Sequence, residues 1–359
     1  MRKGFVLAAA LFAALSVSAP VQAQYMTKQQ AYNYARYRNA QYQKQQAFEN
    51  QITVRYRDAL QAYSAGNYSG CINYLSNNYV AARYQTKKDY NIAMGDSYYK
   101  LGHYSQATPY LKRAYNMGAN IALVNVGLGM SYYKLGDSQD AISYLQAASS
   151  SNLADGEVLW ALADSYSKAN NQSGMQAALE ALVSRYPSCK KEAYSALANT
   201  YFSQNNIQKG LSVALMGLKY FPKDGDILFW AGHGYFLKQD FENAISYLAQ
   251  SNQVIPNNID TLYDLGFSYL SKDDLDNAAA CADRMAQVNK DHPKTQELQK
   301  AVAEKVAQKQ MEQQMQMDMM NQAMQSAQEA ADQGMQQGMD TAMDNAAMSN
   351  PVMTTPAGM

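Results

Sequence analysis

The sequence predicts an all-α solenoid of about seven helix-turn-helix units with an extra helix at each end, and three periodic features support this prediction. Six tyrosines follow one another at steps of 34, 34, 35, 34 and 34 residues. A small residue stands three positions before each tyrosine, and turn-forming residues follow it. A period near 34 residues is typical of stacked helical hairpins, which bury their apolar faces against their neighbours. The tyrosines are Tyr98, Tyr132, Tyr166, Tyr201, Tyr235 and Tyr269.

The first element, residues 1–23, has the pattern of a secretory signal peptide. Arg2 and Lys3 precede an apolar run over residues 5–15, and Val21-Gln22-Ala23 ends the segment. We expect cleavage after Ala23 and export, with the bacterial periplasm favoured over the extracellular space. The apolar run is too short to span a bilayer, and no later stretch is apolar enough, so we expect a protein that is not membrane-spanning.

The next element, residues 24–51, is rich in tyrosine and glutamine and predicts a helix. Thr27 and Gln30 have the spacing of a capping box, which favours a helix start at this point. We expect this helix to cap the first repeat of the solenoid. An arm that contacts a partner through its tyrosines is the alternative.

The repeats occupy residues 52–293, and glycine or alanine fills the small position before each tyrosine. Glycine inside a helix costs about 1 kcal/mol relative to alanine, so its recurrence at one phase predicts close approach of a neighbouring backbone. The small residues are Gly95, Gly129, Ala163, Ala198, Gly232 and Gly266. The units lie near residues 52–87, 88–121, 122–155, 156–190, 191–224, 225–258 and 259–293.

After the repeats, residues 294–333 predict a C-terminal helix that is rich in methionine and glutamine. Leu298, Val302 and Val306 recur every four residues, which places them on one helix face that would cover the last repeat. Twelve of the twenty methionines lie between Met311 and Met359. We expect self-association or partner binding through this helix, and a disordered tail over residues 334–359.

The repeated pattern resembles that of the tetratricopeptide-repeat (TPR) family, and the resemblance covers about residues 52–293. One unit carries the whole pattern, an aliphatic residue, Ala-Gly, Tyr, an aromatic residue, Ala, Leu and Pro: Leu228, Ala231, Gly232, Tyr235, Phe241, Ala244, Leu248 and Pro256. The resemblance implies a protein-interaction scaffold whose concave groove is lined by the first helix of each unit. It also implies which positions face that groove: the second, fifth, ninth, twelfth and thirteenth of each repeat.

These positions give a predicted partner-binding groove in which early units present tyrosine with lysine and later units present aromatic rings. The anchors that we expect to matter most are Trp160, Phe229, Phe236, Tyr263 and Phe267, with Lys100, Lys134 and Lys168 as an electrostatic fringe. Packing of these rings against the chain's own methionine-rich tail is the alternative. The predicted groove residues are Tyr99, Lys100, Tyr133, Lys134, Trp160, Lys168, Phe229, His233, Phe236, Tyr263 and Phe267. Asp96 and Asp164 stand four residues before Lys100 and Lys168, as expected for solvated helix pairs.

Other chemistry is disfavoured by the composition. The Ser-x-x-Lys spacing of Ser97–Lys100 recurs at the repeat period, as scaffold residues would, so we expect no catalytic site and no cofactor. The methionine cluster lacks histidine or cysteine, which disfavours a copper site and leaves no metal site. Removal of the signal leaves 28 basic and 30 acidic residues, so nucleic acid is not an expected partner. The three cysteines are too few and too far apart for a disulfide framework, and we expect them to be small buried residues.

These observations predict a non-enzymatic protein–protein interaction scaffold of the bacterial envelope that binds a peptide or helix in its concave groove. A structural component of an envelope assembly or secretion complex, acting through its terminal helices, is the main alternative. A carbohydrate-binding module is a further one. The sequence leaves open the partner, the oligomeric state, the choice between groove and terminal helices, periplasm or secretion, and the redox state of the cysteines.

Overall fold

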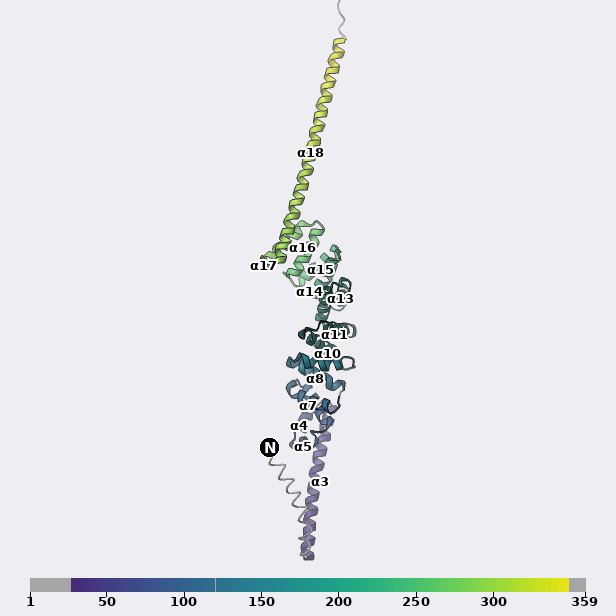
Figure 1. The fold of residues 1–359 in the computed structure, drawn as a ribbon, viewed down its shortest axis with the longest axis vertical. Coiled ribbons are helices and arrows are strands. Elements are labelled where there is room, and N and C mark those ends of the chain that lie inside the picture. The colour runs from purple at the N-terminus through teal and green to yellow at the C-terminus, as the bar shows by residue number, and fades with distance from the viewer. Residues whose placement is uncertain (1–26, 120, 349–359) are drawn as a thin grey trace, which may run out of the picture. The chain divides into compact units, whose positions relative to one another are not determined.

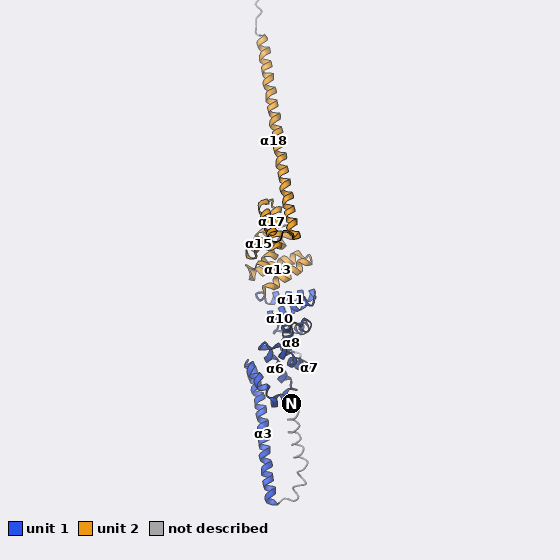
Figure 2. Ribbon diagram, turned by 90° about the vertical axis from the view of Figure 1, so that its left-hand side faces the viewer, with its two compact units in different colours: residues 1–189 blue, residues 190–359 orange. Residues whose placement is uncertain are grey.

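The computed structural model describes residues 27–119 and 121–348, which form sixteen α-helices and no strand. The chain divides into two compact units, Met1–Cys189 and Lys190–Met359, which are coloured separately in Figure 2. The predicted signal peptide at 1–23 and the end of the predicted tail lie outside the described residues. The prediction of an all-α repeat fold is confirmed.

The first unit contains nine of these helices, labelled in Figure 1 where there is room. They are α3 (Lys28–Ser64), α4 (Tyr68–Leu75), α5 (Asn78–Tyr84), α6 (Lys88–Lys100), α7 (Tyr104–Asn116), α8 (Ala122–Leu135), α9 (Ser138–Ala148), α10 (Gly156–Lys168) and α11 (Gln172–Arg185).

The second unit contains the other seven helices of the described chain. They are α12 (Lys191–Ser203), α13 (Ile207–Tyr220), α14 (Gly225–Leu237), α15 (Phe241–Val254), α16 (Ile259–Ser271), α17 (Leu275–Asn289) and α18 (Pro293–Met348). None of the helices in residues 27–119 and 121–348 has the length and apolar character that a membrane span requires.

Successive helices pack as hairpins, and a left-handed residue makes the turn in each. In α3–α4, α6–α7, α8–α9 and the pairs that follow up to α16–α17, the two helices of a pair are in extensive contact. The turn residue has a positive φ and stands four positions after the repeated tyrosine from Tyr98 onward. Glycine, asparagine and aspartate tolerate this backbone conformation best. The turn residues are Gly66, Gly102, Gly136, Asn170, Asn205, Gln239 and Asp273.

The small residue of the first helix lets the second helix of the same hairpin approach closely. A Cβ atom added at Gly129 would lie 2.6 Å from Leu145 Cγ and 2.9 Å from the Leu145 backbone nitrogen. Gly95 meets Leu111 at the same distances, and Gly232 meets Leu248 at 2.6 Å and 3.1 Å. The predicted approach of a neighbouring backbone is therefore confirmed at these three glycines.

The repeated tyrosines pack onto the second helix of their own hairpin. Tyr98 stacks on Tyr110 and Tyr132 stacks on Tyr144, each with ring centroids 5.8 Å apart. In the second unit, Tyr235 stacks in the same way on a ring twelve residues later, at 5.5 Å. Because these rings serve the hairpins, the most periodic residues of the chain are structural.

At the N-terminal side, α3 is one continuous helix of 37 residues, whereas we expected a separate cap helix ending near residue 51. The expected capping box is present, with Thr27 and Gln30 bonded to each other's backbone. Only the later part of α3 is in the core, through Ile52 and Ala59, and α5 is a short helix that the sequence pattern does not predict. The first repeat therefore departs most from the predicted hairpin.

At the C-terminal side, α18 runs for 56 residues and only its beginning packs on the last repeat. Leu298 is fully buried and Val302 is 9% exposed, while every residue from 310 to 348 is exposed. The helix continues through Gly334 and Gly338, beyond residue 333 where we expected it to end. Each glycine costs a helix only about 1 kcal/mol, and the surrounding Met, Gln and Ala residues are good helix formers.

Two of the three cysteines are buried and one is not. Cys71 and Cys281 lie in the cores of their units, and burial raises the pKa of the Cys281 thiol to about 11. Cys189 is exposed, contrary to the expectation that all three are buried.

We expect Gly129→Ala to lower the free energy of unfolding by about 1–3 kcal/mol, because its methyl group would overlap the Leu145 side chain and backbone. Gly338→Ala is the matched control. It meets nothing within 4 Å, so only the helix propensity of α18 changes. Urea unfolding followed by circular dichroism measures both variants. A Gly129→Ala variant as stable as the wild type would show that this contact does not limit helix approach.

Candidate partner-binding surfaces

The predicted groove residues lie on the first helices of successive repeats. We describe them separately for the two compact units of the chain. In the first unit α6 contacts α8 and α8 contacts α10, and in the second unit α12 contacts α14 and α14 contacts α16. We call the first set the tyrosine–lysine surface: Tyr99, Lys100, Tyr133, Lys134, Trp160 and Lys168. We call the second set the aromatic surface: Phe202, Phe229, Trp230, His233, Phe236, Tyr263 and Phe267.

Tyr133 is the centre of the tyrosine–lysine surface. The ammonium groups of Lys168 and Lys134 lie 5.3 Å and 5.5 Å from the centroid of its ring, within the range of cation–π attraction. Lys168 also pairs with Asp164 at 2.7 Å, as expected from their spacing. Two repeats therefore share one cluster of alternating positive charge and aromatic rings.

The phenols of this surface remain neutral over the physiological pH range. Burial raises the pKa of Tyr133 to about 12, and the charge of Asp164 and a hydrogen bond to it add to the shift. Burial, followed by the charge of Asp155, raises the pKa of Tyr99 to about 12. Lys100 lies 5.3 Å from the Tyr99 ring, and Trp160 is half-buried on α10.

Asp96 differs from the expected solvated partner of Lys100. Its residue is only 3% exposed, and its carboxylate accepts a hydrogen bond of 2.9 Å from the Tyr63 hydroxyl. Burial raises the pKa of Asp96, while the Tyr63 hydrogen bond and the Lys100 charge oppose the shift. The prediction of an exposed pair is wrong for Asp96, because α3 of the preceding repeat covers it.

Four rings of the aromatic surface form one cluster in the second unit. Phe202 of α12 stacks on Trp230 of α14 with centroids 5.7 Å apart, and it meets the His233 ring edge-on at 5.2 Å. Phe229 stacks on His233 at 5.7 Å. All four residues are half-buried, so the cluster is only partly covered by the protein itself.

Small residues provide the room for Phe202. A Cβ atom at Gly210 would lie 2.8 Å from the Phe202 ring, and one at Gly234 would lie 3.0 Å from it. The two glycines belong to α13 and α14, the two helices that follow α12 in sequence. Two glycines, which are less favourable in a helix than alanine, therefore leave the space that the Phe202 ring occupies.

A buried carboxylate fixes His233 within the cluster. Asp264 of α16 contacts His233 Nδ1 at 2.7 Å, and their side chains are 5% and 23% exposed. A histidine held at one nitrogen by a carboxylate has a set ring orientation and offers its other nitrogen to a ligand. His233 is thus a fixed polar group beside three apolar rings.

Phe202 occupies the twelfth position of its repeat, which the resemblance places in the groove, whereas Trp230 is outside the predicted groove positions. Trp230 occupies the sixth position of its repeat, where earlier units have small residues. The residues at this position are Ala93, Gly127, Ala161, Ala196, Trp230 and Asp264. Trp230 and Asp264, the two residues at this position that are not small, both contact His233. Their departure from the repeat pattern is the feature of the sequence that could have indicated the cluster.

The remaining predicted residues lie nearer to other elements of the second unit. Tyr263 and Phe267 have centroids 4.7 Å apart, and Lys294 at the start of α18 lies 5.0 Å from the Tyr263 ring. Burial, followed by a hydrogen bond to Glu297, raises the pKa of Tyr263 to about 12. The beginning of α18 therefore covers part of the last repeat, as we expected for the C-terminal helix.

The described residues offer no ready metal site. Within 27–119 and 121–348, no group of three or more His, Cys, Asp or Glu side chains is arranged to hold an ion.

Comparison with known families matches the Tetratricopeptide repeat family over residues 92–148 and 126–188. A comparison with curated protein sequences found no match.

Several solved structures are similar. One is YrrB, described as a TPR protein with an unusual peptide-binding site, at 14% identity and a TM-score of 0.46, covering 53% of this chain and 97% of that one. Another is PilF of Pseudomonas aeruginosa, at 15% identity and a TM-score of 0.43, covering 59% and 96%. These scores are too low to support an inference about partners.

The family match lies in the first unit, and the second unit repeats its hairpins, left-handed turns and glycine–leucine contacts. Residues 92–188 therefore belong to the tetratricopeptide-repeat family.

Proposed function

We propose that this chain is an interaction scaffold that binds an extended peptide or a helix on the aromatic surface of its second unit. Tetratricopeptide-repeat proteins are in general non-enzymatic modules for protein–protein interaction. The observation that carries the proposal is the half-buried cluster of Phe202, Phe229, Trp230 and His233. Partly exposed rings of this size stay in contact with water unless a ligand covers them.

The cluster favours a ligand with an apolar or aromatic side chain next to a polar group. The phenyl and indole rings would cover the apolar side chain, and trimming such a ring at the centre of an interface costs about 2 kcal/mol or more. His233, oriented by Asp264, would bond a backbone or side-chain polar group of the same ligand. This combination of rings with one fixed polar group suits a short peptide motif.

The tyrosine–lysine surface of the first unit would add charge selectivity. Lys134 and Lys168 lie against Tyr133, and Lys100 lies against Tyr99, so three cations stand on first helices of successive repeats. An acidic stretch of a partner fits this surface better than a basic one. The energy of such exposed pairs is small, so we assign them to steering and register more than to affinity.

The setting that we propose is the bacterial envelope. The support is the pattern of residues 1–23, with two basic residues, an apolar run and Val21-Gln22-Ala23. The two alternatives remain distinct: an envelope assembly component would act through α3 and α18, and a carbohydrate-binding module would be seen by binding to a glycan array.

We expect peptides selected from a displayed peptide library on the wild-type chain to bind a Phe229→Ala, Trp230→Ala variant at least ~10-fold more weakly. The reason is the loss of two adjacent rings from the aromatic surface. Tyr220→Ala is the matched control, because Tyr220 is an exposed ring of the same unit outside the cluster. Fluorescence anisotropy of labelled peptides measures all three chains. Equal affinity for the double variant would remove the aromatic surface as the binding site.

We expect expression in a bacterial host to give a mature protein that begins at Gln24, because Ala23 ends the predicted signal. Intact-mass spectrometry of the periplasmic fraction is the measurement. An Ala23→Arg variant should remain uncleaved, since signal peptidase sites require small residues at this position. Recovery of the wild-type chain with residues 1–23 intact in the cytoplasm would contradict the proposed setting.

A further inference from the structure

Two long helices have exposed segments that carry charge of opposite sign. In α3, residues 28–48 are exposed except for half-buried Tyr34, and α3 extends here away from α4 and α5 (Figure 1). This segment has four basic residues and no acidic residue: Lys28, Arg36, Arg38 and Lys44. We call it the basic segment.

The exposed part of α18, residues 310–348, has the opposite composition. It contains six acidic residues and no lysine or arginine. We call it the acidic segment, and its charged residues are Glu312, Asp318, Glu329, Asp332, Asp340 and Asp344. A protein with nearly balanced total charge thus places unbalanced charge of each sign on a separate bare helix.

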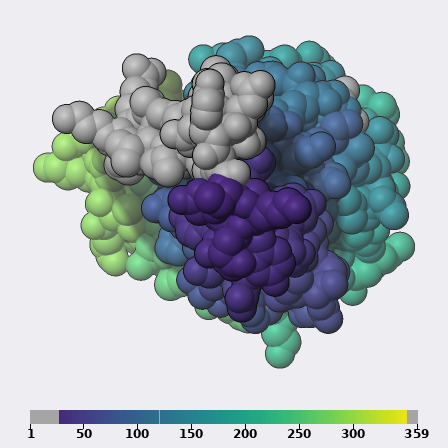
Figure 3. Space-filling view, turned by 90° about the horizontal axis from the view of Figure 1, so that it is seen from below, coloured from purple at the N-terminus to yellow at the C-terminus, as the bar shows by residue number. Residues whose placement is uncertain are grey.

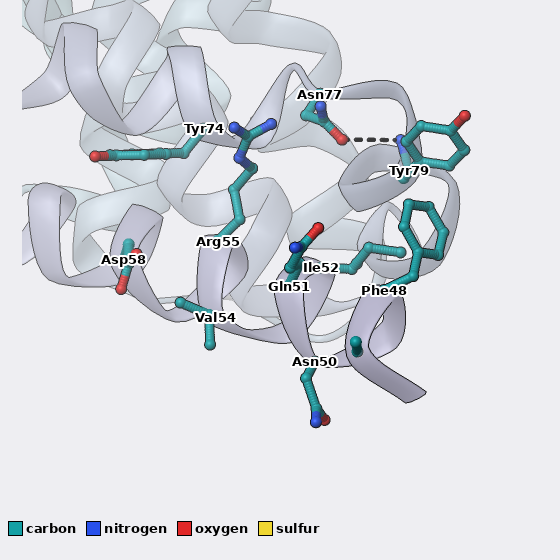
Figure 4. A pocket seen from close by; sticks show the side chains of 11 residues that line it. Phe48, Asn50, Gln51, Ile52, Val54, Arg55, Asp58, Tyr74, Asn77 and Tyr79 are labelled. Atoms are coloured by element: carbon teal, nitrogen blue, oxygen red, sulfur yellow. Dashed lines mark hydrogen bonds between the residues drawn. The ribbon is translucent and has the colours of Figure 1, made fainter. Parts of the chain in front are cut away.

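An open groove lies where the basic segment joins the first hairpin. Its volume is about 580 Å³, and Figure 4 shows Phe48, Ile52 and Val54 of α3 opposite Tyr79 and Tyr74. Phe48 and Tyr79 meet edge-on at 4.9 Å, yet they remain 41% and 58% exposed. In the space-filling view of Figure 3, the N-terminal part of α3 (purple) forms the surface nearest the viewer. The groove and the basic segment are continuous along one helix.

The acidic segment has the apolar side chains to fill such a groove. Met311, Met315 and Met319 follow one another at four-residue steps, so they lie on one side of the helix, and each is at least 56% exposed. Met335, Met339 and Met343 repeat this arrangement. Methionine is flexible and adapts to irregular apolar surfaces.

We propose that the acidic segment of one copy of this chain lies along the basic segment of a second copy, with its methionines in the groove at Phe48 and Tyr79. The charges favour this pairing over pairing of like segments, which would bring four cations or six anions onto the same side of one interface. The acidic segment is also long enough, because its 39 helical residues span about 58 Å and the 21 residues of the basic segment span about 31 Å. The acidic segment therefore covers the whole basic segment and reaches the groove.

Because this contact joins an acidic segment to a basic one, a pair of copies still has one free basic segment and one free acidic segment. Contacts of this kind continue into open chains or close into rings. The protein would then present its repeat surfaces many times along one assembly. The inference does not rest on the proposed peptide binding, because the segments lie outside both repeat surfaces.

A reciprocal charge exchange tests the proposal in the chain that starts at Gln24. One variant carries Arg36→Glu, Arg38→Glu and Lys44→Glu, and the other carries Asp318→Lys, Glu329→Lys and Asp332→Lys. We expect sedimentation velocity of the wild type at low salt to show a mass that rises with protein concentration and falls at high salt. Each variant alone should associate at least ~10-fold more weakly, because the first would pair two acidic segments and the second would leave the acidic segment with no net charge to attract the basic one. An equal mixture of the two variants should regain the association, because each supplies the complementary segment to the other.

The control is Lys219→Glu, Lys223→Glu, Lys238→Glu, which reverses three exposed charges outside both segments and should associate like the wild type. Circular dichroism shows whether each variant keeps its helix content, and the regained association of the mixture itself requires both to be folded. A wild type that stays monomeric at all concentrations would overturn the proposal, and so would a mixture that fails to associate. A wild type that stays monomeric is also the result expected if the two segments pair within one chain, so that arrangement too would overturn the proposal.

Discussion

The close contact between the two helices of each hairpin is the constraint on which the rest of the structure depends. At Gly95, Gly129 and Gly232 the first helix has no side chain, and a leucine of the second helix takes the space, with its backbone nitrogen near the glycine. A larger residue would push the helices apart and open the core that each hairpin shares with the next. Because this contact recurs at the same position of three repeats, their hairpins close in the same way, which favours regular stacking.

Residues that close the hairpins are buried within them, and other residues remain for binding. The repeated tyrosines pack inside the hairpins, and the cluster of the aromatic surface comes from positions that differ between repeats. Trp230 and Asp264 replace small residues at the sixth position, and with His233 they form a fixed cluster of rings and one polar group. The bare parts of α3 and α18 add a second kind of surface, in which charge of one sign is spread along a single helix.

Much of the fold could be predicted from the sequence, because each hairpin is determined by local signals. The recurring glycine position, the turn residues and the period of the tyrosines can be recognised without knowing which distant residues are in contact. The burial of Asp96 depends on Tyr63 of the preceding repeat, and the cluster at Phe202 depends on two glycines from other helices, so neither follows from one repeat alone. The persistence of α18 through Gly334 and Gly338 depends on how strongly the neighbouring residues favour a helix, which a single breaker residue does not reveal.

Hydrogen exchange of the dilute, monomeric chain, followed by mass spectrometry, tests this account most directly. If the hairpins closed by glycine–leucine contacts hold the stability, peptides from α6 to α11 and from α12 to α17 will exchange slowly. Residues 28–48 and 310–348, which have no core beneath them, will exchange rapidly under the same conditions. Slow exchange of these two terminal segments, or hairpins that exchange as rapidly as they do, would contradict the account.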